Sequence, residues 1–103
     1  MLNGSVARLI ATRTWDAGFD FAAYVKAKEE LARDQVAALR LLRENTAVVV
    51  DAIGAVSDAD LAVNVETPFQ TRTLAQIIAY PYWNMSYHEG QINYIASMLG
   101  CLS

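Results

Sequence analysis

Cysteine, histidine and charge are scarce in this sequence of 103 residues. The single cysteine, Cys101, excludes an internal disulfide, and the N-terminus lacks the basic start and long apolar core of a signal peptide; both features favour a reduced, cytoplasmic setting. No apolar run approaches the about 18 residues of a membrane-spanning helix, so we expect no membrane association. The eight lysines and arginines are scattered and the formal net charge is −3, which argues against nucleic acid as a partner.

The residues that are abundant describe one folded helical domain. Hydrophobic residues make up 54% of the chain and charged residues 18%, as in globular proteins. Apolar positions recur at helical spacing along most of it, which predicts an all-α fold. The predicted elements are an N-terminal arm with a short helix capped by Ser5 (1–19), a long helix ending at Gly54 (20–54), a connection that is partly extended (55–73) and a C-terminal helix (74–100).

Local capping signals place the starts of the two long helices. Asp20 is a good N-cap, and Phe19 and Tyr24 occupy the hydrophobic positions that flank a first turn. Thr73 followed by Gln76 is a capping box, which predicts that the last helix starts at position 74.

The C-terminal helix carries a polar cluster on an apolar face. Its apolar positions recur at steps of four and three, and His88, the only histidine, fills the single gap in that series. At about 100° per residue, Asn84 and Gln91 lie within roughly 60° of His88. Such a histidine is more often held by hydrogen bonds in a helix interface than used as a metal ligand or acid–base group, so the residue alone does not decide.

Four aromatic residues form a stripe beside this face. Tyr80, Tyr87 and Tyr94 stand seven positions apart, and Trp83 lies between the first two. A stripe of this kind is usually core, but it also fits an aromatic wall that binds a small molecule.

The run from Tyr87 to Ile92, with the sequence YHEGQI, resembles the last helix of the DinB-like proteins, which are metal-binding four-helix bundles of bacteria. The segment PFQTRTLAQII (68–78) resembles the stretch that leads into that helix. In the family, two histidines four residues apart precede Gly-Gln, and a third from an earlier helix completes a divalent-metal site. Only His88 matches, Asn84 stands four positions before it, and no other histidine exists. The resemblance therefore implies the fold and, at most, a weakly bound Zn²⁺ or Ni²⁺ through His88.

The resemblance covers residues 20–100, which correspond to the second half of the family's bundle. Folded back on each other, the two long helices make a hairpin that leaves each apolar face half exposed. Either the chain is part of a longer protein, or two copies form a homodimer with a shared four-helix core. Antiparallel pairing would bring Gln35 close to His88 and form a polar pocket with Asn84 and Gln91.

The sequence thus predicts a DinB-like protein of unknown activity without an intact metal site. Alternatives are a non-catalytic helical dimerisation domain, a small-molecule-binding bundle, or a divergent metal-dependent hydrolase or thiol transferase. A bound metal ion would favour the metal-dependent enzyme, and the half-exposed apolar face favours the dimerisation domain.

Overall fold

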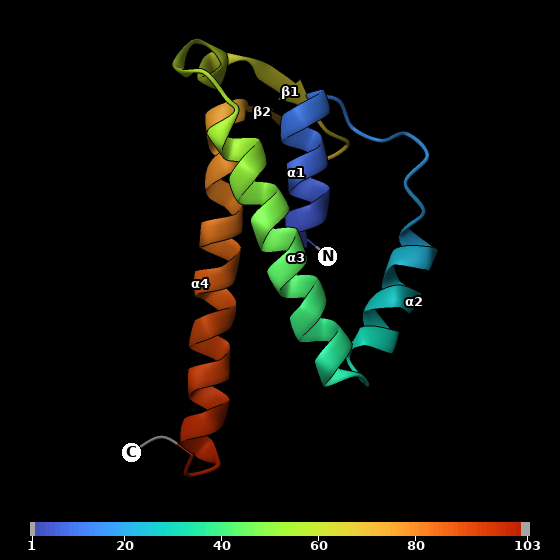
Figure 1. Cartoon of the computed structure of the whole chain (residues 1–103), viewed down its shortest axis with the longest axis vertical. Coiled ribbons are helices and arrows are strands. Elements are labelled where there is room, and N and C mark those ends of the chain that lie inside the picture. Colours follow the sequence, from blue (N-terminus) through green and yellow to red (C-terminus); the bar gives the residue numbers. More distant parts are fainter. Residues whose placement is uncertain (1, 102–103) are drawn as a thin grey trace.

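The structure is a computed structural model and describes residues 2–101. It is mostly helical, as predicted (Figure 1). The elements are α1 (Leu2–Thr12), α2 (Phe21–Leu31), α3 (Gln35–Gly54), the 3-10 turn η1 (Asp58–Ala62), strands β1 (Asn64–Glu66) and β2 (Thr71–Thr73), and α4 (Leu74–Met98). In the part of the chain that is described, no helix combines the length and apolar character needed to cross a membrane.

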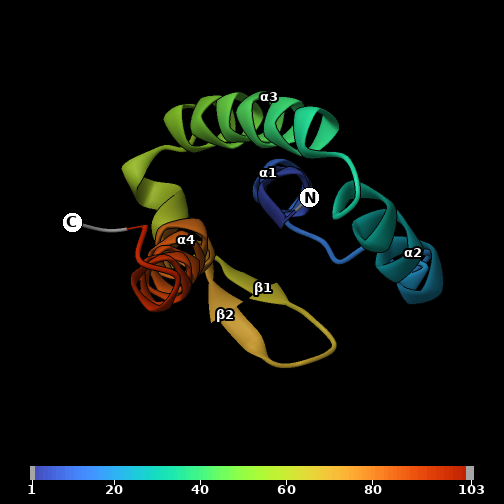
Figure 2. The same cartoon turned by 90° about the horizontal axis from the view of Figure 1, so that it is seen from below.

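Helix α1 packs along α3 and also contacts α4 (Figures 1 and 2). It supplies Val6, Ala7 and Ile10 to the hydrophobic core, where they meet residues of α3, β1 and α4. The other buried apolar residues are Val49, Val65, Leu74 and Ile77. The predicted short helix of the N-terminal arm is present, but it begins at Leu2 instead of after Ser5, and its residues form the centre of the core. A short helix could not be recognised as central because its role depends on contacts with distant parts of the chain.

The predicted long helix over 20–54 is also wrong, because it is two helices that meet at a turn. Helix α2 ends at Leu31, and Asp34 adopts an extended conformation before α3. The Asp34 carboxylate accepts a hydrogen bond from the Ala37 backbone N–H at 3.0 Å. A short acidic side chain can thus start a new helix although the helical repeat of apolar residues continues across it. The other N-cap, Asp20, is confirmed, since it accepts from Ala23 N at 3.0 Å.

The connection and the last helix follow their predicted boundaries. Strands β1 and β2 form an antiparallel hairpin with Val65 opposite Arg72, within the segment expected to be extended. The capping box is confirmed: Thr73 Oγ1 accepts from Gln76 N at 3.3 Å, and Gln76 Oε1 accepts from Thr73 N at 2.9 Å. From there α4 continues as one helix of 25 residues through the buried Pro81.

An ion pair joins the end of α1 to η1. Arg13 has a left-handed backbone (φ 58°) just after the helix, and its Nη2 lies 2.8 Å from Asp60 Oδ2. Ser57 Oγ also donates to Asp60 Oδ2, at 2.9 Å. The hydrogen bond from Arg13 and then that from Ser57 hold the pKa of the Asp60 carboxyl below its ordinary value of 3.8.

Candidate functional site

His88 and Gln91 form a hydrogen-bonded pair on one face of α4. The distance from His88 Nδ1 to Gln91 Oε1 is 2.6 Å. Because an amide oxygen can only accept, this contact places the proton of a neutral imidazole on Nδ1 and leaves the lone pair on Nε2. The Tyr87 ring packs edge-on against the imidazole, with centroids 5.5 Å apart. The side chain is exposed but fixed in orientation, as a ligand or proton acceptor requires.

The other two residues of the predicted polar pocket do not join this pair. Asn84 is half-buried one turn earlier on α4, and no hydrogen bond connects it with His88. Gln35 is exposed in the first turn of α3. Figures 1 and 2 show that this end of α3 lies beside α2 and away from α4. The hairpin geometry behind the pocket fails because α3 diverges from α4 towards its N-terminal end, where it meets α2 (Figure 1).

The predicted aromatic wall is a ladder on the surface of α4. The ring centroids of Tyr80 and Trp83 are 5.6 Å apart, and those of Trp83 and Tyr87 are 5.8 Å apart in a stacked pair. Tyr94 continues the stripe and shares a shallow hollow with Tyr87. All four side chains are exposed, so the ladder encloses no ligand on its own.

The donor set around His88 does not fit the metal site that the family resemblance implies. His88 Nε2 is one imidazole ligand, and its nearest polar partners on α4 are carboxamides, which bind Zn²⁺ weakly. Over residues 2–101, no group of three or more histidine, cysteine, aspartate or glutamate side chains is placed to hold an ion. A further strong ligand would have to come from outside the described chain.

The apolar face that carries His88 is uncovered over its second half. At its start, Leu74, Ile77 and Pro81 are buried. Further along the same face, Ile92 is 65% exposed and Leu99 is 73% exposed. The exposed large apolar residues of α4 are Tyr80, Tyr82, Trp83, Met85, Tyr87, Ile92, Tyr94, Ile95, Met98 and Leu99.

A second aromatic cluster was not predicted as a site. Trp15 and Phe19, in the loop after α1, meet Phe69 in the turn between the strands, with Trp15 and Phe69 centroids 5.9 Å apart. The expected contact of Phe19 with Tyr24 is confirmed at 5.5 Å. The contact between Phe19 and Tyr24 was the only part of this cluster that the sequence indicated, because Trp15 and Phe69 lie far apart in the sequence.

No family model, curated protein or solved structure matches this chain.

Proposed function

We propose that this chain is a DinB-like helical domain, without a complete metal site of its own, that associates with a second copy through the exposed face of α4. The family proposal rests on the YHEGQI run and the segment that leads into it. The association proposal rests on one observation: the apolar face of α4 continues well beyond the elements that cover it.

Helix lengths explain why the cover is incomplete. At about 1.5 Å per residue, α1 with its 11 residues spans about 16 Å, whereas α4 with 25 residues spans about 38 Å. Helix α3 runs away from α4 on the side opposite the hairpin (Figures 1 and 2). The face that includes Ile92, Ile95 and Leu99 therefore has no neighbour within the described chain.

The exposed area matches what an obligate dimer buries. A folded monomer of 11.3 kDa exposes roughly 5,700 Å², but this chain exposes 7642 Å², which is about 1,900 Å² more. Obligate dimers bury about 1,000 to 2,500 Å² on each partner. The chain is also extended, with a radius of gyration of 15.7 Å against about 13 Å for a compact domain of this length. One interface of ordinary obligate size would account for the difference.

The free energy of covering this face decides how large the interface must be. Full burial of a large apolar side chain contributes about 1.5 to 3 kcal/mol, so covering the exposed Met85, Ile92, Ile95 and Leu99, which share this face, on both copies contributes on the order of 10 kcal/mol. Loss of translational and rotational freedom costs about 4 to 15 kcal/mol. A contact at one end of the helix is therefore too weak, and we place the interface along the whole length from Tyr82 to Leu99.

The polar pair on the face is compatible with burial between two copies. The hydrogen bond between His88 Nδ1 and Gln91 Oε1 is already made, which lowers the cost of removing the pair from water. His88 Nε2 and the Gln91 amide N–H groups need partners from the second copy, and isolated polar groups of this kind fix the register of two helices.

The free Nε2 atom also favours a second candidate, a divergent metal-dependent hydrolase or thiol transferase with ligands from both copies. Metal analysis of the purified protein separates the two. Stoichiometric Zn²⁺ or Ni²⁺ that survives dialysis, and is lost on His88→Ala, would establish the metal site.

Two pairs of substitutions on opposite sides of α4 test the association. We expect Ile92→Glu with Ile95→Glu to give a monomer, because two carboxylates would be buried without partners. Ser86→Glu with Ser97→Glu adds the same charge on the polar side of the helix and should leave the dimer intact. Sedimentation velocity compares the two; equal behaviour of both variants would contradict the proposal.

A further inference from the structure

A cavity of about 790 Å³ lies between α1, the loop that follows it, α2 and the turn of the hairpin. Six aromatic residues line it, including all three phenylalanines of the chain: Trp15, Phe19, Phe21, Tyr24, Phe69 and Tyr80. Ligand sites in proteins commonly measure about 300 to 1,000 Å³ and are mostly apolar with a few polar groups. Apart from Tyr80, the aromatic lining comes from elements other than α4, so this cavity is distinct from the proposed dimer face.

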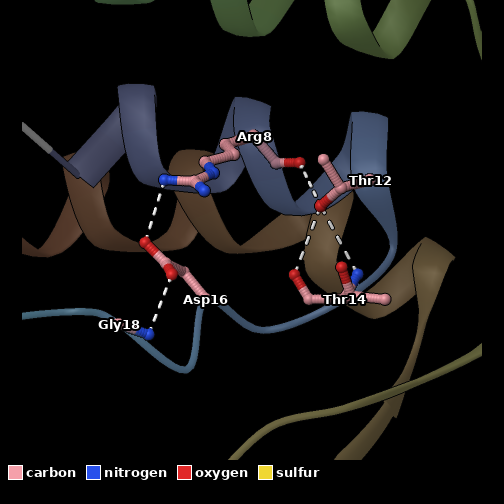
Figure 3. Close-up of polar contacts among 5 residues, drawn as sticks. All are labelled: Arg8, Thr12, Thr14, Asp16 and Gly18. Atoms are coloured by element: carbon pink, nitrogen blue, oxygen red, sulfur yellow. Dashed lines mark hydrogen bonds and ion pairs between the residues drawn. The ribbon is translucent and has the colours of Figure 1, made fainter.

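Polar contacts hold the loop after α1, which forms one wall of the cavity, against that helix (Figure 3). Arg8 Nη1 lies 2.9 Å from Asp16 Oδ2, and Asp16 Oδ1 accepts from Gly18 N at 3.0 Å. Thr12 Oγ1 donates to the Arg8 carbonyl at 2.9 Å and contacts the Thr14 carbonyl oxygen at 3.2 Å. These contacts within the chain hold the loop that carries Trp15 and Phe19 against α1 and so position the aromatic wall.

Among the charged residues that line the cavity, one arginine has no carboxylate partner within residues 2–101. Asp16 is paired with Arg8, whereas Arg72 on β2 forms no ion pair with any residue of the described range 2–101. The Arg72 guanidinium faces the side-chain amide of Gln70, which is neutral. A guanidinium beside an aromatic wall is suited to a carboxylate, sulfonate or phosphate group.

The size and the lining of the cavity fit a small molecule. Its volume of about 790 Å³ lies within the range of small-molecule sites, and its lining combines aromatic rings with one arginine that has no carboxylate partner in the described range 2–101. We propose that the cavity binds a planar aromatic molecule with one anionic group, with its rings against the aromatic cluster of Trp15, Phe19 and Phe69 and its anion at Arg72.

A matched pair of fluorescent probes tests this assignment. 1-Anilinonaphthalene-8-sulfonate is a planar aromatic anion, and N-phenyl-1-naphthylamine is the same ring system without the sulfonate. We expect the anion to bind one site per chain and at least about tenfold more tightly than the neutral probe, as one charge-assisted hydrogen bond provides. Arg72→Gln should remove this difference, whereas Arg43→Gln, an exposed arginine on α3 outside the cavity, should preserve it.

Three outcomes would overturn the proposal. One is equal affinity of the two probes in the original protein or equal effects of Arg72→Gln and Arg43→Gln. Another is loss of probe binding in the Ile92→Glu, Ile95→Glu variant with the cavity intact, which would place the probe on the dimer face. The third is a change of assembly mass on Phe69→Ala, which would show that a second copy fills the cavity. Circular dichroism verifies that each variant is folded.

Discussion

Asn3 Nδ2 donates a hydrogen bond to Thr46 Oγ1 at 3.1 Å and so joins the first helix to α3. Asn3 is the buried polar residue of the core, with 5% of its surface exposed, and its Nδ2 also lies 3.8 Å from Met85 Sδ on α4. One amide group therefore touches both α3 and α4. This contact fixes the position of α1 along its neighbours more narrowly than apolar packing alone.

Removal of this hydrogen bond should destabilise the fold measurably. We expect Asn3→Ala to lower the free energy of unfolding by about 1 to 3 kcal/mol, because the Thr46 hydroxyl loses its partner in a partly buried place. Thr46→Val should have a smaller effect of the same sign. In a double-mutant cycle by urea unfolding, the two effects should be less than additive. Strict additivity would mean that the two side chains do not interact.

The Asp34 cap should matter more than an ordinary surface aspartate. Asp34→Ala removes the acceptor for Ala37 N and should cost about 0.5 to 2 kcal/mol of stability. Asp51→Ala provides the control, since Asp51 is exposed in the last turn of α3 and caps nothing. Thermal unfolding compares the variants; equal melting temperatures would show that Asp34 does not separate α2 from α3.

The Asp60 ion pair predicts a loss of stability in acid. The folded pKa of Asp60 lies below its unfolded value, so its contribution is present above about pH 4 and is lost as the pH falls through the folded pKa. The difference in unfolding free energy between the original protein and Asp60→Asn should therefore be largest near neutral pH and disappear in strong acid. A difference between the original protein and Asp60→Asn that is independent of pH would rule out this ion pair as the cause.

Gly90 offers an independent test of the α4 interface. A Cβ at this position would meet nothing within 4 Å, so in an isolated chain Gly90→Ala should raise helix stability by about 0.5 to 1 kcal/mol. At about 100° per residue, Gly90 lies within roughly 40° of Ser86 and Ser97 and about 160° from Ile92, on the side of α4 that points away from the proposed interface. We expect Gly90→Ala to leave self-association unchanged; a weaker dimer would place Gly90 in the interface.

Features set by neighbouring residues were predictable from the sequence. The capping box of Thr73 and Gln76 and the Asp20 cap each act within four residues, and both lie where the sequence predicted. The end of α3 at Gly54 is equally local. The polar pair was partly predictable, because His88 and Gln91 are one turn apart on the same helix.

Features set by distant contacts were not predictable in the same way. The few apolar residues of α1 gave no indication that this helix would fill the core against α3 and α4. Gln35 therefore does not lie near His88, as the predicted helical hairpin required. The break at Asp34 was hidden because the apolar period continues across it. Trp15 and Phe69 come together only when the hairpin folds against the loop after α1.

Sedimentation equilibrium of the unmodified chain tests the central claim most directly. At micromolar concentration we expect a mass of about twice 11.3 kDa, and a melting temperature that rises with protein concentration because folding and association are coupled. A monomer of 11.3 kDa that melts cooperatively, independent of concentration, would contradict the proposal that a second copy covers the face of α4.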